Sequence, residues 1–529
     1  MKRSYEQRLI HARLLHELLS NSVCKDPDKT ALIIEGKAYS YGRFYDAAMN
    51  LAGHLRMMGV ERGDRVVIFM DNTWPSMVSV YGAQMSGAVF VLVNPLTKAD
   101  KLGYIVEDSG ARVLLTDSHL ARVFLGISPR ILSRLTIICS NYSGKVDTVQ
   151  GMSLLDFERL IAEEVPGSVL PALIPLDLAA LIYTSGSTGF PKGVMHTHQS
   201  MVFSVRSLVE YLRLNSTDRI FLALPMAFDY GLYQLLMAMT VGATLVVERS
   251  FTYLGLVLKR LWEQEITCLP AVPTVFSMLI AAHHKNALSF PSIEIVTSTA
   301  ADLPAEQIPE LMEIFPNALI FKMYGLTECK RVSYLDPERL KDKPTSVGRA
   351  IPGTEILLLD EEGDPVQPGE VGILHVRGPH IMLGYWRMPE RSREMLKPGP
   401  LPGERILCTH DRFRMDEDGD LYFLGRSDDI IKSRGEKVSP VEVERVVHQL
   451  DGVCEAAVVA APDELLGEAI ILYVSVEEGY CLSVSDIKRH CIAHMENFMI
   501  PKHIYIRASL PKTANGKIDK LKLAQESQS

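Results

Sequence analysis

Short apolar runs of strand length alternate with helical patterns through about the first 350 residues. The clearest runs are RVVIFM (65–70), AVFVLV (88–93), ARVLLTD (111–117) and ATLVVER (243–249). Nearly continuous apolar runs are typical of strands that are covered on both faces. Their regular alternation with helices predicts α/β architecture with largely parallel sheets.

The pattern changes after about residue 350. Segment 355–378 contains apolar strands separated by Asp, Gly and Pro clusters, which predicts an antiparallel sheet. KPGPLPGE (397–404) is rich in proline and glycine, so we expect an exposed loop there. A charged turn, GRSDDIIKSRGEK (425–437), then precedes a compact tail.

The tail has the pattern of a small α+β domain. A helix, two strands and a second helix are predicted at 441–450, 454–462, 469–476 and 484–495. The charged turn marks the boundary. The expected division is an N-terminal domain over 1–425, a connecting segment over 426–429, which the family resemblance given below implies is a hinge, and a C-terminal domain over 430–529.

Bulk composition disfavours several classes of protein. Of 529 residues, 47% are hydrophobic and 22% are charged, as in globular proteins, and the longest apolar runs are too short to cross a bilayer. We therefore expect no integral membrane association. The net charge of −9 disfavours nucleic acid as a partner. The eight cysteines form no C-x-x-C pair and the N-terminus lacks a signal-peptide core, so we expect a reduced, cytoplasmic setting.

The segment TSGSTGFPKGVMHTH (184–198) carries the sharpest chemical signal. It follows the apolar run LAALIY (178–183) and combines glycines, hydroxyl residues and Lys192. Glycines let backbone N–H groups point inward, and hydroxyls and an ammonium add donors, which suits a polyphosphate. It is not a Walker A loop, because Pro191 and Gly193 occupy the places of its glycine and its Ser/Thr. A flexible surface loop is the alternative, and the density of the motif argues against it.

YTSGSTGFPKGV resembles the signature of the adenylate-forming superfamily, which includes acyl-CoA synthetases, luciferases and adenylation domains of peptide synthetases. YGLTE (324–328), THDRFRMDEDGDLYFLGRSDDIIKSRGEKVSP (409–440) and PKTANGKIDK (511–520) follow in the family's order. The resemblance implies a large N-terminal domain of stacked α/β subdomains with an antiparallel β subdomain, and a small mobile α+β C-terminal domain. It also implies an ATP-dependent, AMP-forming ligase that adenylates a carboxylic acid and passes the acyl group to a phosphopantetheine thiol.

The same resemblance assigns residues to ATP and Mg²⁺. Lys517 resembles the catalytic lysine, Glu328 the Mg²⁺ ligand, and Thr184 a catalytic residue of the phosphate loop. Asp411 would bind the ribose, and Asp428 would be the hinge. The remaining residues expected at the nucleotide are Ser185, Gly186, Ser187, Thr188, Gly189, Lys192, Ser298, Thr299, Ala300, Tyr324 on the adenine, Gly325, Thr327 on the α-phosphate, and Arg426.

Three positions depart from a simple assignment. His410 stands where the family usually has glycine, so the local turn is expected to differ. Thr299 stands where glycine is common in the adenine-side loop. His196 and His198 lack the further spaced partners of a zinc site, so we expect both to be structural.

The segment LPMAFDYGLYQ (224–234) bears on the acid substrate. Many acyl-CoA synthetases have histidine where this chain has Phe228-Asp229. FDYGLYQ and TECKRVSYL (327–335) more specifically resemble stand-alone ligases that load β-amino acids onto carrier proteins in macrolactam pathways. This resemblance favours a β-amino acid whose ammonium pairs with Asp229. The expected substrate residues are Phe228, Asp229, Ser298, Gly325, Lys330 and Arg331.

Alternatives stay open at each of these charged residues. Asp229 could instead cap a helix that starts at about Gly231. Lys330 and Arg331 could recognise a second carboxylate or a phosphate, and water around at least one of them is the simpler expectation.

The acceptor is expected to come from another molecule, because only nine residues follow PKTANGKIDK. An acyl or peptidyl carrier protein in trans is the favoured partner, and free CoA, which presents the same thiol arm, is the alternative. A third possibility of another class is an inactive homologue that serves as a binding protein. Lys192, Glu328, Asp411 and Lys517 argue against it.

Overall fold

A first sheet carries the predicted strands at 65–70, 88–93 and 111–117. In this computed structural model its order is β19-β9-β8-β4-β3-β5-β6-β7. The bounds are β3 (Arg65–Phe69), β4 (Val89–Val93), β5 (Val113–Asp117), β6 (Thr136–Ser140), β7 (Ser153–Asp156), β8 (Leu178–Thr184), β9 (Lys192–Thr197) and β19 (Gly384–Tyr385). Strands β3 to β7 pair in parallel with their neighbours, as predicted, whereas β8 and β9 form an antiparallel hairpin.

The structure describes most of the chain. The described residues are 12–142, 153–166, 170–184, 191–426, 429, 431–433, 436–463, 467–513 and 516–527.

A second sheet has the order β16-β15-β14-β13-β12-β10-β11-β1-β2. Its strands are β1 (Thr30–Ile34), β2 (Lys37–Ser40), β10 (Arg219–Leu222), β11 (Thr244–Val247), β12 (Cys268–Ala271), β13 (Ile295–Ser298), β14 (Leu319–Tyr324), β15 (Ser333–Tyr334) and β16 (Arg349–Ala350). The strands from β1 through β11, β10, β12 and β13 to β14 are parallel. Their carboxyl ends therefore share one edge, where ligands bind in open α/β sheets.

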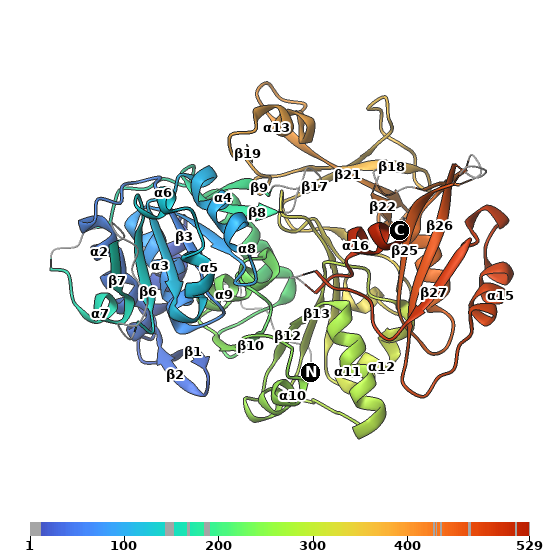
Figure 1. Cartoon of the computed structure of the whole chain (residues 1–529), viewed down its shortest axis with the longest axis horizontal. Helices are drawn as coiled ribbons and strands as arrows, with labels where there is room; N and C mark the ends of the chain where they lie inside the picture. Colours follow the sequence, from blue (N-terminus) through green and yellow to red (C-terminus); the bar gives the residue numbers. More distant parts are fainter. Residues whose placement is uncertain are drawn as a thin grey trace.

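Helices fill the space between the two sheets and cover their outer faces (Figure 1). The helices of the two sheets are α1 (Leu15–Val23), α2 (Tyr41–Met57), α3 (Trp74–Ser86), α4 (Ala99–Ser109), α5 (Ala121–Phe124), α6 (Pro129–Leu132), α7 (Phe157–Ala162), α8 (His198–Leu212), α9 (Asp229–Val241), α10 (Leu254–Glu263), α11 (Pro273–Asn286) and α12 (Ile308–Ile314).

The strand β3 shows how one sheet serves two cores. Val66 and Ile68 face the core shared with α2, α3, α8 and α9, whereas Val67 and Phe69 face the core under α4 and α5. Both sets are buried because successive side chains in a strand point to opposite faces. Helix α9 is apolar on all sides and almost wholly buried, as expected of a helix enclosed by other elements.

The antiparallel segment predicted after residue 350 is confirmed. Its sheet has the order β17-β18-β21-β20, and β22 also pairs with β21. The bounds are β17 (Glu355–Leu359), β18 (Val371–Arg377), β20 (Leu396–Pro398), β21 (Arg405–Met415), β22 (Leu421–Arg426) and helix α13 (Pro389–Met395). The loop predicted at 397–404 is exposed over most of its length, but Lys397 and Pro398 belong to β20, where Pro398 ends an edge strand and needs no amide donor.

The C-terminal part forms its own sheet, drawn in red in Figure 1, with the order β24-β23-β26-β25 and β27 beside β26. The bounds are β23 (Ile431–Ser433), β24 (Glu436–Val438), β25 (Val453–Asp463), β26 (Gly467–Val476), β27 (His503–Arg507), α14 (Pro440–His448), α15 (Val484–His494) and α16 (Lys520–Ser527). Helices α14 and α15 share a core with one face, and α16 packs on the other face. The predicted large α/β part and small α+β part are confirmed. Every helix among the described residues is too short or too polar to cross a membrane.

Candidate active site

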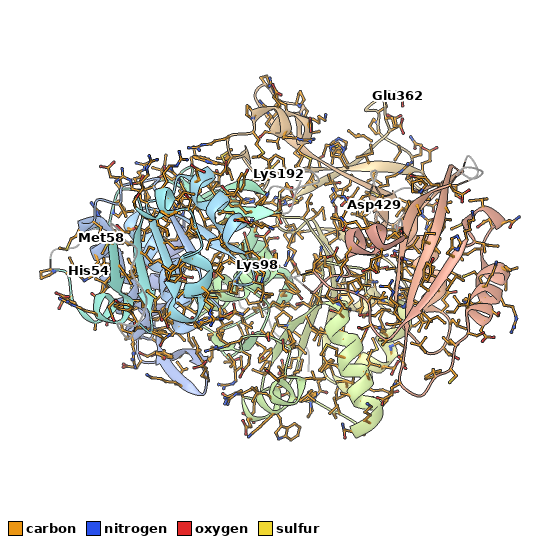
Figure 2. The ribbon with its side chains drawn as sticks, in the orientation of Figure 1. His54, Met58, Lys98, Lys192, Glu362 and Asp429 are labelled. Atoms are coloured by element: carbon orange, nitrogen blue, oxygen red, sulfur yellow. The ribbon has the colours of Figure 1, made fainter. Side chains whose placement is uncertain are left out.

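The β8–β9 hairpin positions the base of the predicted phosphate loop. Thr184 ends β8 and lies opposite Lys192, the first residue of β9. Figure 2 shows Lys192 where the strands of the first sheet approach the antiparallel sheet. The hairpin therefore offers a hydroxyl and an ammonium side by side. Ser185, Gly186, Ser187, Thr188 and Gly189 lie outside the described residues.

Glu328 follows β14 and lies close to that hairpin through one tyrosine. Tyr385 Oη donates to Glu328 Oε1 at 2.6 Å, and Lys192 Nζ lies 4.7 Å from the centre of the Tyr385 ring. The predicted metal ligand and the predicted phosphate lysine thus contact one aromatic side chain, at its hydroxyl and at its ring face respectively. Tyr385 lies outside the sequence motifs described above.

Tyr324 and Asp411 form the predicted nucleoside end. The Tyr324 hydroxyl donates to Asp411 Oδ2, and Arg426 Nε lies 3.5 Å from Asp411 Oδ1. The Tyr324 ring packs against Phe413 and Phe423, at centroid distances of 4.8 and 6.0 Å. Burial raises the pKa of Asp411 to about 6, against the opposing effects of Tyr324 and Arg426.

Lys517 belongs to the C-terminal part and reaches this nucleoside end. Averaged over all its atoms, Lys517 is exposed. Desolvation of its ammonium lowers the pKa of Lys517, and the charge of Arg426 lowers that pKa further. The charge of Asp411 acts in the opposite direction and raises it. The backbone next to it is anchored to the second sheet, because Thr274 Oγ1 donates to Gly516 O at 3.1 Å. The structure therefore brings Lys517, Asp411 and Arg426 together from segments far apart in the sequence.

A carboxylate holds the C-terminal part against the second sheet. Asp302 accepts from Arg445 Nε of α14 at 3.0 Å, and Lys322 Nζ of β14 lies 3.2 Å from its other oxygen. Burial would raise the pKa of Asp302, but Lys322 and Arg445 outweigh it and hold that pKa low. The predicted hinge residue, Asp428, lies outside the described residues.

Backbone conformation explains two of the departures seen in the sequence. His410 has φ +58°, the left-handed conformation that glycine adopts freely, so it keeps a glycine-like turn at a small conformational cost. In the adenine-side loop the positive φ, +80°, belongs to Ala300 rather than to Thr299, which is buried.

Gly325 lets the chain fold back on itself after β14. A side chain there would meet Lys330 O at 2.3 Å and Arg331 Cα at 2.9 Å, so only glycine fits. Lys330 closes the turn with φ +66°. This close approach delivers the side chains of Lys330 and Arg331 to the start of α9.

Asp229 and Lys330 form an ion pair at the predicted acid site. Lys330 Nζ lies 2.7 Å from Asp229 Oδ1, and the two side chains are 0% and 9% exposed respectively. The expectation that Asp229 caps a helix is wrong, because Phe228 precedes α9 and Asp229 is its first residue. The expectation that water surrounds Lys330 or Arg331 is also wrong, since both residues are buried.

Arg331 adds a second cation beside this pair. Its Nη1 donates to Lys330 O at 2.8 Å, and its guanidinium lies 5.1 Å from the ring centre of Tyr230 in α9. Its Nε and Ser298 Oγ at the end of β13 are buried and have no hydrogen-bond partner among the described residues. Buried polar atoms without partners are uncommon in proteins and call for an explanation, such as a ligand.

Both histidines after the phosphate loop are structural, as predicted. His196 is buried and its Nε2 donates to Thr327 O at 2.9 Å, which fixes the main chain beside Glu328. Burial and the nearby Lys330 lower the pKa of His196, so the ring stays neutral. His198 Nδ1 accepts from Leu15 N at 3.1 Å.

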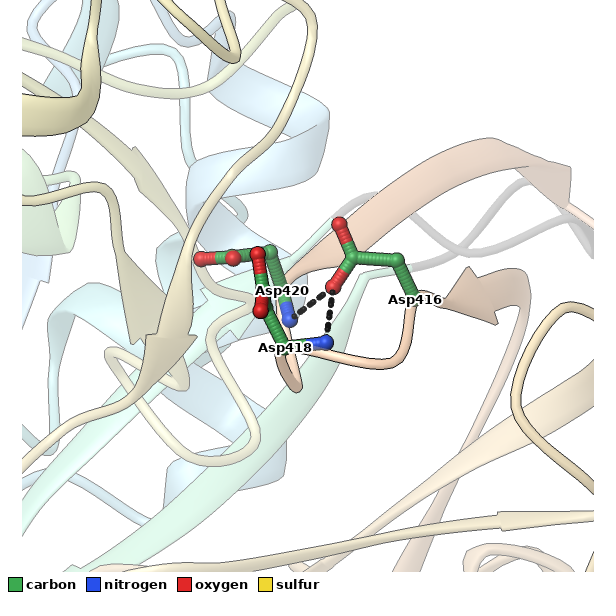
Figure 3. A group of neighbouring side chains, drawn as sticks. All are labelled: Asp416, Asp418 and Asp420. Atoms are coloured by element: carbon green, nitrogen blue, oxygen red, sulfur yellow. Dashed lines mark hydrogen bonds between the residues drawn. The ribbon is translucent and has the colours of Figure 1, made fainter.

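A separate acidic cluster is already neutralised. Asp416, Asp418 and Asp420 lie on one turn before β22, where backbone amides of the turn donate to Asp416 (Figure 3). Lys343 Nζ contacts all three carboxylates at 2.6 to 2.8 Å, and Arg339 contacts two of them. The lysine occupies the place that a cation would take, so this cluster joins the sheets rather than forming the active site.

Family models match both parts of the chain. The AMP-binding enzyme model matches residues 19–386, and the AMP-binding enzyme C-terminal domain model matches residues 442–517. The chain therefore belongs to the AMP-binding enzyme family, and it is an AMP-forming acid–thiol ligase. The two matches lie on either side of residues 426–429.

Curated relatives come from both branches of this family. A long-chain-fatty-acid–CoA ligase of Salmonella typhimurium is 30% identical over 97% of this chain and 94% of its own length. Tyrocidine synthase 3 of Brevibacillus parabrevis is also 30% identical over 98% of this chain, which spans 8% of that much longer protein. Among solved structures, an anthranilate CoA ligase in complex with anthranoyl-AMP superposes with a TM-score of 0.88 at 27% identity, over 97% of each chain.

Proposed function

We propose that this enzyme adenylates a small amino acid that carries a second carboxylate, with a β-amino acid favoured, and transfers the acyl group to the phosphopantetheine thiol of a carrier protein. The observation that carries the proposal is the buried set of opposite charges at the start of α9, formed by Asp229, Lys330 and Arg331.

The ATP half of the reaction uses charges of the described residues. A carboxylate must attack the α-phosphorus although both groups are anionic, so catalysis depends on positioning and charge neutralisation. Lys192 would bind the β- and γ-phosphates, and Asp411 would accept hydrogen bonds from the ribose. Lys517, beside the nucleoside end, would stabilise the charge that develops between the attacking carboxylate and the α-phosphate. Its lowered pKa reflects desolvation, which strengthens such a contact.

The residues present fit a Mg²⁺ ion. Mg²⁺ prefers oxygen ligands and often uses one carboxylate plus phosphate oxygens. Glu328 is half-buried, and among the described residues its Oε1 accepts from Tyr385 while no bond to its Oε2 is present. A metal held there would neutralise charge on the departing pyrophosphate.

The charges at the acid site disfavour a plain fatty acid. Asp229, Lys330 and Arg331 together carry one negative and two positive charges, so one positive charge is in excess. Lys330 occupies Oδ1 of Asp229, and among the described residues Oδ2 has no bonded partner. An acyl chain of methylene groups would supply no counter-ion for the excess positive charge of Arg331, and a desolvated charge without a counter-ion is costly.

A substrate with both an ammonium and a second carboxylate matches this set. The ammonium would bind Asp229 Oδ2, and the second carboxylate would bind Arg331, whose Nε has no partner. An ammonium alone would raise the local positive charge, whereas the two groups together leave it unchanged. The preference for a β-amino group is supported by the resemblance of FDYGLYQ and TECKRVSYL to β-amino-acid ligases.

The carrier protein stays the proposed acceptor and free CoA the alternative. One relative, tyrocidine synthase 3, is a multidomain synthase, and another is a CoA ligase, so the similarities support both acceptors. The eight cysteines are free thiols, which supports the proposed cytoplasmic setting. Incubation with ATP, acid and either CoA or a panel of purified phosphopantetheinylated carrier proteins, followed by mass spectrometry, distinguishes them. Thioester on CoA alone would contradict the carrier assignment.

The acid assignment is tested with Asp229→Asn, which is similar in shape but neutral. We expect this variant to lose pyrophosphate exchange with amino acids by about a hundredfold, because truncation of one partner of a buried pair costs about 3 kcal/mol or more. Exchange with the matched des-amino acid should change far less. Full activity of the variant on the amino acid would contradict the role of Asp229.

A further inference from the structure

Tyr385 lies between two groups that the proposed function assigns to the polyphosphate. It belongs to β19, a short strand that pairs with β9 at the edge of the first sheet, with Tyr385 opposite Val194. Its side chain is 3% exposed. Because β9 begins at Lys192, Tyr385 is attached to the strand that carries the phosphate lysine.

The chain around Tyr385 braces the two groups through its backbone. Trp386 N donates to Gly193 O at 2.7 Å, next to Lys192, and Met382 N donates to Glu328 O at 2.7 Å. Tyr385 N donates to Ser392 Oγ at 2.8 Å. This short segment therefore joins the phosphate hairpin to the main chain of the predicted metal ligand.

The side chain of Tyr385 also connects Lys192 with Glu328. The hydroxyl donates to Glu328 Oε1 at 2.6 Å, and the ring lies under Lys192 Nζ at 4.7 Å. A cation over an aromatic face is attracted by the ring, although a neutral ring cannot replace a phosphate as its partner.

We propose that Tyr385 is a positioning residue for adenylation, an inference that rests on the proposed function. Its hydroxyl holds Glu328 through Oε1, so that Oε2, which has no bond among the described residues, would be available to a metal. Its ring holds the Lys192 ammonium over one face while its hydroxyl holds Glu328, and among the described residues these two opposite charges form no ion pair with each other. One side chain thereby keeps an ammonium and a carboxylate both available to Mg²⁺–ATP.

Two substitutions separate the hydroxyl from the ring, and binding rather than turnover is the readout. Isothermal titration measures the affinity of a non-hydrolysable ATP analogue without acid, in EDTA and in saturating Mg²⁺. In Tyr385→Phe we expect the affinity measured in EDTA to stay within about twofold of the wild type. The gain in affinity on adding Mg²⁺ should fall about tenfold, which is the size of effect expected for loss of one hydrogen bond to a charged group. In Tyr385→Leu metal-free binding should weaken as well, because Lys192 is then free to pair with Glu328.

Tyr183→Phe is the matched control. Tyr183 Oη in β8 of the same sheet donates to Asp108 Oδ2 in α4 at 2.5 Å, so this variant also loses a hydroxyl–carboxylate bond. It should lose similar thermal stability without any change in metal dependence. In a Glu328→Gln background, Tyr385→Phe should add nothing to the loss of metal dependence.

Three outcomes would overturn the proposal for Tyr385. They are an unchanged metal dependence in Tyr385→Phe, an equal loss in EDTA and in Mg²⁺, and an additive effect in the Glu328→Gln background. Failure of the wild type to bind the analogue under any condition would instead overturn the proposed function.

Discussion

Asp229 and Lys330 form a buried ion pair, with Lys330 Nζ 2.7 Å from Asp229 Oδ1. One residue starts α9 and the other closes the turn after Glu328, so the pair fastens the predicted acid site to the predicted metal ligand. Burial lowers the pKa of Lys330, and the charge and hydrogen bond of Asp229 oppose this shift.

The pair predicts an asymmetry in stability. Asp229→Ala leaves a buried ammonium without its counter-ion and should cost about 3–5 kcal/mol, whereas Asp229→Ala with Lys330→Met removes both charges and should recover part of that loss. Thermal unfolding midpoints should therefore rank wild type, double variant and single variant in descending order. Glu107→Ala, which breaks the exposed pair with Arg130, is the control and should cost less than about 1 kcal/mol. Equal midpoints for the single and double variants would contradict this prediction.

Lys517 should matter for one half-reaction alone. Its charge is required when the α-phosphorus is attacked, so Lys517→Ala should slow pyrophosphate exchange by about a hundredfold or more. Thioester formation from a supplied acyl-adenylate should stay near the wild-type rate. The control is Lys520→Ala, which removes a nearby lysine that pairs with Glu444 instead. An equal decline in both half-reactions of Lys517→Ala would show that the lysine has another role.

The contact between Arg445 and Asp302 should favour the first half-reaction. It holds the C-terminal part where Lys517 reaches Asp411, so Arg445→Ala should reduce pyrophosphate exchange more than thiolation. Asp428→Pro should show the opposite pattern, because a fixed φ at the predicted hinge would hinder rotation to a second orientation. Both effects are measured by assaying pyrophosphate exchange and thioester formation separately for each variant. Equal losses with a lowered melting temperature would indicate misfolding.

Asp411 predicts a pH dependence of nucleoside binding. Its pKa is raised from 3.8 to about 6, so the carboxylate becomes protonated as the pH falls through about 6 and loses its charge as an acceptor. Adenosine, which has no phosphate to titrate, should bind about tenfold more weakly at pH 5 than at pH 7.5. Binding of 2′,3′-dideoxyadenosine, which lacks the ribose hydroxyls, should not change. A flat profile for adenosine would contradict the assignment.

The raised pKa of Asp411 affects protein stability in the opposite direction from nucleoside binding: a fall in pH weakens binding but favours the folded state. Because burial raises the pKa of Asp411 above 3.8, the folded protein binds its proton more tightly than the unfolded chain. The contribution of Asp411 to the free energy of unfolding is therefore fully present below about pH 4 and is lost as the pH rises through about 6. The ionised carboxylate that suits ribose binding is thus maintained at a cost in stability.

Local patterns predicted the strands, and family motifs assigned the residues expected at ATP, an assignment that stays a prediction. Val66 to Phe69 are apolar because both faces of β3 are covered. YGLTE and PKTANGKIDK are motifs of five and ten consecutive residues, so each can be found in the sequence without knowledge of the fold. These features could be predicted because each depends on neighbouring residues or on a motif of the family.

Contacts between distant residues could not be predicted. Lys330 meets Asp229 across 101 positions because Gly325 permits a close approach that no local pattern reveals. Tyr385 meets Glu328 across 57 positions, and Arg445 meets Asp302 across 143. A charged residue in a sequence is expected to be solvated until the fold supplies its partner, which is why the sequence alone predicts water around at least one of Lys330 and Arg331.

The most direct test of the account is acid-dependent pyrophosphate exchange by the wild type across a matched set of acids. Aspartate carries both charged groups, 3-aminobutyrate keeps only the ammonium, succinate keeps only the second carboxylate, and butyrate has neither. We predict that, of these four acids, aspartate has the highest kcat/KM in one of its two stereoisomers. 3-Aminobutyrate should fall about a hundredfold, because Arg331 is then left without a counter-ion at a cost of about 3 kcal/mol, and butyrate should be the poorest. A preference for butyrate or for longer unsubstituted acids over aspartate would contradict the account.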